Sequence, residues 1–259
     1  MTLQVLDLVV GISIRTSYGF LGWSSISLIH DTVLNDYILL DVGGFNTRQL
    51  LFKSLERLGI EPKHISKILI THLHFDHCMN LELFPRATVY ISKKELDYIY
   101  SGTPMARGDI FIPKPYIDSI LKTVNVVEIS GGAKVHEDIV AVELPGHTPG
   151  SMGYLVASTK TIFVGDAIKN LYELLTQNPT LCFGTRENWL NSLTKVLNLA
   201  QYIIPGHDMR IEVKDKSIRR IGKTILITIE LAQATTTKKY ELKKNHKYIH
   251  YTTINVLIQ

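Results

Sequence analysis

The stretch THLHFDH at residues 71–77 carries the strongest signal in this chain of 259 residues. It directly follows KILIT (67–71), a short apolar and β-branched run that predicts a buried strand. A cluster of imidazole and carboxylate groups is hard to place in an apolar core, because polar groups buried without partners are costly. The cluster therefore predicts a metal site at the end of a strand.

The spacing within the cluster indicates how its side chains can be used. His72 and His74 are two residues apart, so an extended backbone points them the same way. Asp76 and His77 lie just beyond, where a turn can direct them toward a second point nearby. Such ligands suit zinc, iron or manganese, and without a cysteine ligand a closed structural zinc site is not expected.

Three more ligand-type residues stand at the ends of strand-like segments. Glycine or proline beside each one lets the chain turn sharply and present the side chain at a loop tip. One such histidine alone is more often structural, so these residues gain meaning only together with the cluster. They are His147 in ELPGHTPGS (143–151), Asp166 in FVGDA (163–167) and His207 in IIPGHD (203–208).

The rest of the chain predicts an α/β domain with two packed sheets covered by helices. Helices are expected from Asn46 to Gly59, over 93–100, and on the face marked by Trp189, Leu193, Val196 and Ala200. We expect residues 1–209 to form this domain and residues 210–259 a basic, β-prone extension. Strands are expected at the N-terminus and at 25–30, 37–42, 67–71, 88–92, 124–129, 139–144, 153–158, 161–165 and 202–207.

Composition limits the class of protein. Hydrophobic residues make up 45% and charged residues 20% of the chain, which excludes a disordered protein. Only two cysteines, Cys78 and Cys182, occur, so a cytoplasmic location is expected rather than a disulfide framework. The N-terminus is expected to be a first strand rather than a signal peptide, and no run of 18 apolar residues predicts a membrane segment.

The C-terminal extension holds eleven Lys or Arg against four Asp or Glu over residues 210–259. Its apolar stretches, 223–231 and 248–258, predict strands that pair with their own sheet or with a second subunit. The basic stretch TTTKKYELKKNHK (235–247) is expected to be a turn between them. A homodimer is therefore the expected partner, and nucleic acid is the alternative that the charge leaves open.

Taken together, these residues resemble the ligand pattern of the metallo-β-lactamase superfamily, over about residues 38–207. The resemblance implies an αβ/βα metallo-β-lactamase sandwich, with two mixed β-sheets flanked by helices and the metal site at one edge. It implies two divalent metal ions, with zinc expected and iron or manganese as alternatives. The ligand set carried over is His72, His74 and His147 for one ion, Asp76, His77 and His207 for the other, and Asp166 as the bridge.

Further roles are implied by the same resemblance. Asp41, in DVGG (41–44), matches a position that orients a ligand histidine, although it could also be a plain turn residue. The activity implied is hydrolysis of a small-molecule ester, thioester or lactone by a metal-bridging hydroxide, with Asp76 as ligand and catalytic proton acceptor. A ribonuclease or other phosphodiesterase and a persulfide dioxygenase with one iron remain alternatives. We expect the loop 101–118 to cover the substrate with Met105, Phe111 and Tyr116.

Local segments resemble the small branch called metallo-β-lactamase-domain-containing protein one, some members of which are linked to RNA cleavage. Quorum-signal lactonases share the ligands but carry a tyrosine three residues after the bridging aspartate, where this chain has Lys169; Tyr172 is three residues further on. The segments that resemble the branch are NLELFPRA (80–87), GHTPG (146–150), QNP (177–179) and QYIIPGHD (201–208).

Overall fold

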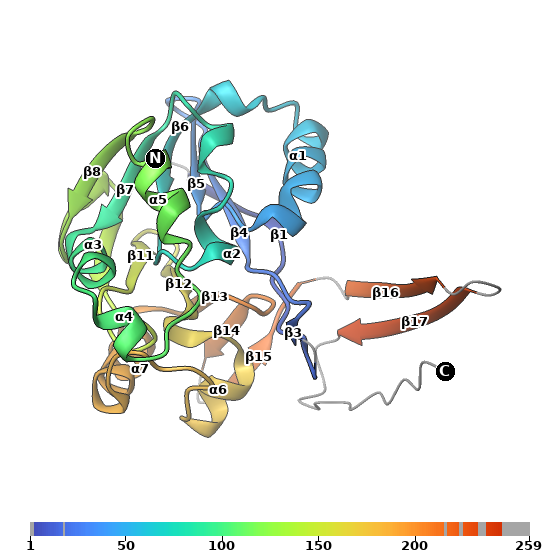
Figure 1. The fold of residues 1–259 in the computed structure, drawn as a ribbon. Coiled ribbons are helices and arrows are strands. Elements are labelled where there is room, and N and C mark those ends of the chain that lie inside the picture. The colour runs from blue at the N-terminus through green and yellow to red at the C-terminus, as the bar shows by residue number, and fades with distance from the viewer. Residues whose placement is uncertain (1–2, 18, 215–216, 223–224, 233–236, 245–259) are drawn as a thin grey trace.

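The computed structural model describes residues 3–17, 19–214, 217–222, 225–232 and 237–244. Two β-sheets lie together in the interior, and helices cover their outer faces (Figure 1). This layer order is the αβ/βα sandwich predicted from the sequence, and it places the carboxyl ends of several strands at one edge. No helix within these ranges is long and apolar enough to cross a membrane.

The first sheet has six strands in the order β1-β4-β5-β6-β7-β8. Strands β1, β4 and β5 pair antiparallel, whereas β5 to β8 run parallel. Parallel neighbours require crossover connections, and helices supply them. The strands are β1 (Leu3–Val9), β4 (Ile26–Asp31), β5 (Asp36–Leu40), β6 (Ile65–Leu69), β7 (Thr88–Ser92) and β8 (Asn125–Ile129), and the connecting helices are α1 (Arg48–Arg57), α2 (Phe75–Cys78), α3 (Lys93–Tyr100), α4 (Thr103–Ala106) and α5 (Lys114–Ile120).

The second sheet has seven strands in the order β15-β14-β13-β12-β11-β10-β9. Its one parallel pairing joins β12 to β13, and the connection between them contains α6 (Leu171–Thr176) and α7 (Arg186–Leu199). The other pairings are antiparallel. The strands are β9 (Lys134–His136), β10 (Ile139–Glu143), β11 (Met152–Val156), β12 (Thr161–Gly165), β13 (Tyr202–Pro205), β14 (Ile211–Lys214) and β15 (Ser217–Arg220).

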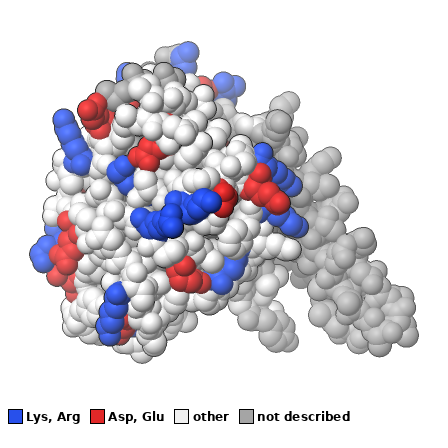
Figure 2. Space-filling model, turned by 90° about the horizontal axis from the view of Figure 1, so that it is seen from above, with Lys and Arg blue, Asp and Glu red and all other residues white. Residues whose placement is uncertain are grey.

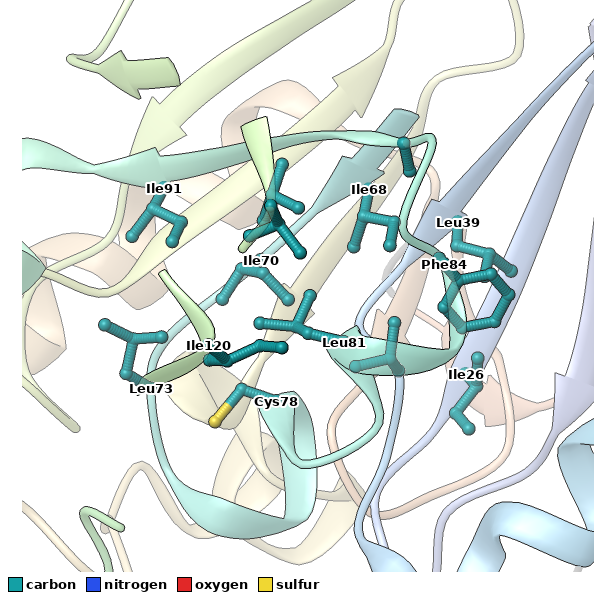
Figure 3. Close-up of a cluster of buried hydrophobic side chains, with 14 of the residues drawn as sticks. Ile26, Leu39, Ile68, Ile70, Leu73, Cys78, Leu81, Phe84, Ile91 and Ile120 are labelled. Atoms are coloured by element: carbon teal, nitrogen blue, oxygen red, sulfur yellow. The ribbon is translucent and has the colours of Figure 1, made fainter. Parts of the chain in front are cut away.

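Alternation along the strands divides the apolar side chains among three cores. Ile38 and Leu40 of β5 point into the core between the two sheets, whereas Leu39 points into the core under the helices of the first sheet. Figure 3 shows this second core, where Leu39 and Ile68 of the sheet lie among the side chains of Leu81 and Phe84. A third core, around Trp189 of α7, packs beneath the second sheet.

Several expectations differ from the structure. The segment 101–118 is not an open loop, because it contains α4 and the start of α5. The basic stretch expected as a turn forms β17 (Thr237–Lys244), which pairs with β16 (Ile225–Ala232) in a two-stranded ribbon. The predicted strand 248–258 lies outside the described residues. A further small hairpin, β2 (Arg15–Thr16) with β3 (Gly19–Phe20), was not expected.

The division of the chain at residue 209 stays a prediction. Strands β14 and β15 continue the second sheet as far as Arg220. Arg220 also forms a buried ion pair with Asp208, with 2.8 Å between its Nε and Oδ1. This continuity favours a domain that ends after Arg220.

Candidate metal centre

The seven predicted ligand residues all follow strands at one edge of the sandwich. His72, His74, Asp76 and His77 follow β6 and lead into α2. His147 lies in the turn between β10 and β11, Asp166 follows β12, and His207 follows β13. Because β6, β12 and β13 are parallel strands of their sheets, their carboxyl ends open onto the crevice where ligands of such folds bind.

These side chains converge on a single cluster. Within each of three groups, one ligand atom per residue lies within 4.8 Å of the others. The first and second of these groups share His72, and the second and third share His77, so the three groups form one continuous cluster. Their role as metal ligands remains a prediction. The groups are His72, His74 and His147; His72, His77 and Asp166; and Asp76, His77 and His207.

The chemistry of the cluster fits bound metal ions. Among the described residues, Nε2 of His72, Nε2 of His77 and Oδ1 of Asp166 are buried without a hydrogen-bond partner. Buried polar atoms are normally paired, so such unpaired atoms facing one another require an explanation. Nitrogen and carboxylate oxygen are the donors that zinc, iron and manganese accept.

The outward nitrogen of each histidine has a partner that fixes the ring. Such outer partners set the tautomer and direct the other nitrogen toward a metal. For His74 this leaves Nδ1 facing the cluster, and for the other four histidines it leaves Nε2. The pairs are His72 Nδ1 with Thr71 Oγ1 (3.1 Å), His74 Nε2 with Asp109 Oδ2 (3.1 Å), His77 Nδ1 with Asp41 Oδ2 (2.7 Å), His147 Nδ1 with the Leu181 carbonyl (3.2 Å) and His207 Nδ1 with the Ile12 carbonyl (3.3 Å).

Asp41 orients His77, as the resemblance implied. Its carboxylate also accepts hydrogen bonds from the Thr71 backbone N–H (2.8 Å) and the Thr71 hydroxyl (2.7 Å). The backbone of Asp41 has a φ of 53°, which lies in the left-handed region that residues other than glycine rarely adopt. The strained backbone and three hydrogen bonds hold this carboxylate behind the ligand loop.

Gly206 allows Asp166 and His207 to approach each other. A Cβ atom at Gly206 would lie 2.0 Å from Oδ1 of Asp166 and 2.8 Å from the backbone carbon of Gly165. Any larger residue would therefore displace the central carboxylate. This contact is the physical reason for a glycine immediately before His207.

The cluster divides electrostatically into two parts. Burial lowers the pKa of His147 to about 3 and holds that of His72 well below its usual value. Burial also opposes charge on His77 and His207, but carboxylates outweigh it and raise both pKa values: Asp76 and Asp41 act on His77, and Asp166 acts on His207. The neutral form is thus favoured for His72 and His147, whereas the protonated form is favoured for His77 and His207.

Three residues that matter to the site escaped the sequence prediction. Asp109, brought by the segment between α4 and α5, contacts His74. Glu95 accepts hydrogen bonds from the Leu73 N–H (3.0 Å) and the Thr148 hydroxyl (2.7 Å), so it ties two ligand loops together. Lys169 Nζ lies 2.8 Å from Asp166 Oδ2. The three-residue spacing from Asp166 could have pointed to Lys169, whereas Asp109 and Glu95 had no local signal.

A pocket opens over the cluster, with His74, Asp76, Asp166 and His207 in its lining. Of the three side chains expected to cover the substrate, Phe111 lines the pocket. The other two expectations were wrong: Met105 is 77% exposed, and the Tyr116 hydroxyl donates a hydrogen bond to Glu82 (2.5 Å). The apolar wall of the pocket consists of Ile12, Ile14, Phe20, Phe75, Phe111 and Leu181.

Comparison with known proteins identifies the family. The family model of the metallo-beta-lactamase superfamily matches residues 24–207, and the chain belongs to this superfamily. It is 28% identical over 172 residues to a Methanocaldococcus jannaschii protein named "Probable metallo-hydrolase", a match that covers 66% of this chain and 70% of that one. It is also 28% identical over 178 residues to metallo-beta-lactamase domain-containing protein 1 of Xenopus laevis, covering 66% of this chain and 65% of that one.

Solved structures show the same fold. A candidate metallo-beta-lactamase from Thermotoga maritima superimposes with a TM-score of 0.66 at 20% identity, covering 82% of this chain and all of the other. A quorum-quenching N-acyl homoserine lactone lactonase superimposes with a TM-score of 0.61 at 20% identity, covering 80% of this chain and 91% of the other. At this identity the likeness concerns the fold alone.

Proposed function

We propose that this protein is a metal-dependent hydrolase of a small ester, thioester or lactone. The observation that carries the proposal is the convergence of the seven ligand-type side chains, with unpaired buried atoms at their centre, beneath an apolar pocket. Membership of the superfamily and the relative named as a metallo-hydrolase support this class of activity. A relative from Azorhizobium caulinodans named as an N-acyl homoserine lactonase, 25% identical over 164 residues, supports a lactone among the candidate substrates.

The donor set would hold two divalent ions, with zinc preferred. His72, His74 and His147 would hold one, Asp76, His77 and His207 the other, and Asp166 lies between the two groups, with Oδ1 3.3 Å from His77 Nε2 and Oδ2 3.5 Å from His147 Nε2. When bound, such ions polarise an electrophilic oxygen and lower the pKa of water to near 7.

Asp76 is placed to move a proton. Its carboxylate lines the pocket, and its Oδ2 lies 3.2 Å from Nε2 of His207. Because Asp76 lies in the pocket wall and belongs to the group that would hold the second ion, its carboxylate can accept a proton from water that attacks a substrate there. The apolar wall around it limits the access of bulk water and favours a substrate with an apolar part.

The pocket wall favours a small molecule over a polynucleotide, because nucleic-acid sites depend on clustered cations that contact phosphates. On the face shown in Figure 2, basic and acidic side chains of the described residues are interspersed. A phosphodiesterase and a mononuclear-iron persulfide dioxygenase remain the rival activities. A cytoplasmic location stays a prediction, supported by the free thiols of Cys78 and Cys182.

Elemental analysis and a substrate panel test the proposal together. Natively purified protein should carry about two transition-metal ions per chain and hydrolyse an ester, lactone or glutathione thioester faster than RNA. His72→Ala should lose metal and activity, whereas His64→Ala, a variant of an exposed histidine outside the cluster, should retain both. About one iron per chain with persulfide oxidation would favour the dioxygenase, and no tightly bound metal would refute the proposal.

A further inference from the structure

Lys169 is a largely buried cation at the pocket that the ligand set does not use. Its side chain is 13% exposed and lines the pocket, and its Nζ lies 2.8 Å from Oδ2 of Asp166. Of the pocket-lining residues in the described part of the chain, it alone carries an ammonium or guanidinium group. Burying an ammonium group is costly, so its place beside the reacting centre requires a compensating role.

The backbone around Lys169 is held from two sides. Its N–H donates to Oε2 of Glu173 (2.8 Å), and its carbonyl accepts from the N–H of His207 (2.7 Å). Asn170 then caps α6 by accepting a hydrogen bond from the Glu173 N–H (3.1 Å). The ammonium is thus positioned by the same turn that positions a ligand histidine, which is the preorganisation that electrostatic catalysis needs.

Neutralising Asp166 is not a sufficient role for this lysine. Asp166 lies between two groups that would each hold a divalent ion, and those ions would already balance its charge. Asp76 and Glu173 are the other carboxylates that act on this ammonium, and a bound ion would likewise balance the charge of Asp76. The ammonium is then available to face a negative group of the substrate. The apolar wall of Ile14, Phe20 and Phe111 favours an uncharged acyl substrate, so the negative group is one that forms during the reaction.

We propose that Lys169 is a catalytic residue that donates a hydrogen bond to the carbonyl oxygen of an acyl substrate as this oxygen becomes negative. The inference rests on the proposed hydrolase function. A water oxygen bonds to the carbonyl carbon, its proton passes to Asp76, and the π-electron pair of the carbonyl moves onto the oxygen facing Lys169. When the double bond re-forms, the bond to the leaving oxygen or sulfur breaks. The leaving group takes the proton from Asp76, which gives a carboxylic acid and an alcohol or thiol.

Lys169→Met and Lys169→Arg test this role on the metal-loaded protein, with 4-nitrophenyl acetate as substrate. Lys169→Met should lower kcat about 100-fold, change KM little and keep the wild-type metal content. Lys169→Arg should recover part of kcat, because it keeps a cationic donor. Lys63→Met, at the opposite end of β6 from the site, is the matched control and should match the wild type.

A binding measurement separates catalysis from structure. A methylphosphonate monoester imitates the negative tetrahedral state. Its Kd should therefore rise in Lys169→Met by about the same factor by which kcat/KM falls. Unchanged kcat/KM or unchanged phosphonate binding would overturn the proposal, and so would loss of metal from Lys169→Met. If wild-type protein with bound metal hydrolyses no ester, thioester or lactone, the proposed function itself fails. Equal phosphonate binding by the wild type and Lys169→Met would in that case reject the role of Lys169 separately.

Discussion

Oδ2 of Asp109 lies 3.1 Å from Nε2 of His74, although 35 residues separate the two in the sequence. The same oxygen accepts a hydrogen bond from the Tyr98 hydroxyl (2.9 Å). Asp109 therefore links the segment between α4 and α5 to a ligand histidine and holds that ring with Nδ1 toward the cluster.

Asp109→Ala is expected to weaken metal binding by the group of three histidines about 10-fold to 100-fold, because outer partners of ligand histidines contribute this much. Competition with a chromogenic chelator measures the affinity. Asp118→Ala is the matched control, since Asp118 lies in α5, outside the cluster, and forms an exposed ion pair with Lys114 (2.8 Å). Equal affinities for the two variants would show that Asp109 does not orient His74.

Asp76→Asn should reduce turnover more than it reduces metal binding. Asparagine cannot take up the proton of water, whereas His77 and His207 remain to hold the ion. Metal content and rate should be measured on one preparation. Activity within about tenfold of the wild type would remove Asp76 from the role of proton acceptor.

Metal occupancy should fall with pH in two steps. Protons must leave His77 and His207 before these rings bind metal, and both pKa values are raised. His147, with a pKa of about 3, has no proton to lose until the solution is strongly acidic. Dialysis from about pH 8 to about pH 5 should therefore remove the ion near Asp76 first. Elemental analysis that finds both ions leaving together, or the other ion leaving first, would contradict this order.

Arg220→Ala should lower the free energy of unfolding by about 3 kcal/mol, because it removes one partner of a buried ion pair. Two contacts of 2.8 Å join Arg220 to Asp208, which follows His207 directly. Arg219→Ala is the control, since Arg219 is 64% exposed and its pair with Glu212 should contribute less than about 1 kcal/mol. Urea unfolding with a chelator present measures the free energy of unfolding of both variants. Equal losses of this free energy would show that the buried ion pair stabilises the protein no more than the exposed one.

Truncation after Gly222 should abolish self-association and leave the metal centre intact. Strands β16 and β17 pair with each other, and among the described strands neither has another neighbour, so each has an open edge that a second subunit could cover. Light scattering measures the mass, and RNA binding at low and high salt tests the rival role. An unchanged oligomeric state together with lost salt-sensitive RNA binding would favour the nucleic-acid role.

Local patterns predicted the layers and the ligand-type segment 71–77, whereas the resemblance to the superfamily implied that His147, Asp166 and His207 join this segment. The five residues of β7 and of β12 were predicted at their observed bounds, since each is a β-prone run with clear breaks. The short strands β9 and β14 have too few residues for a periodic pattern, and α6 was missed as well. The lysine pairs of β17, Lys238–Lys239 and Lys243–Lys244, indicated a solvated turn, whereas pairing with β16 makes this segment a strand.

The site was predictable to the extent that ligand residues stand at strand ends. The contact of His74 with Asp109 depends on how α4 and α5 pack, and the contact of Lys169 with Asp166 on how the chain turns after β12. Such contacts form only when the tertiary structure is complete. The contact of Asp109 has no local signal in the sequence, and for Lys169 the three-residue spacing from Asp166 is the one local signal.

The candidate ligands are shared between two halves of the chain, and this has a consequence during protein synthesis. His72 to His77 leave the ribosome long before His207, which lies 130 residues after His77. At typical rates of translation this interval lasts roughly ten seconds. Metal captured in that time would meet an incomplete set of side chains. The timing of metal supply relative to translation is therefore expected to decide how much newly made protein acquires the correct ions.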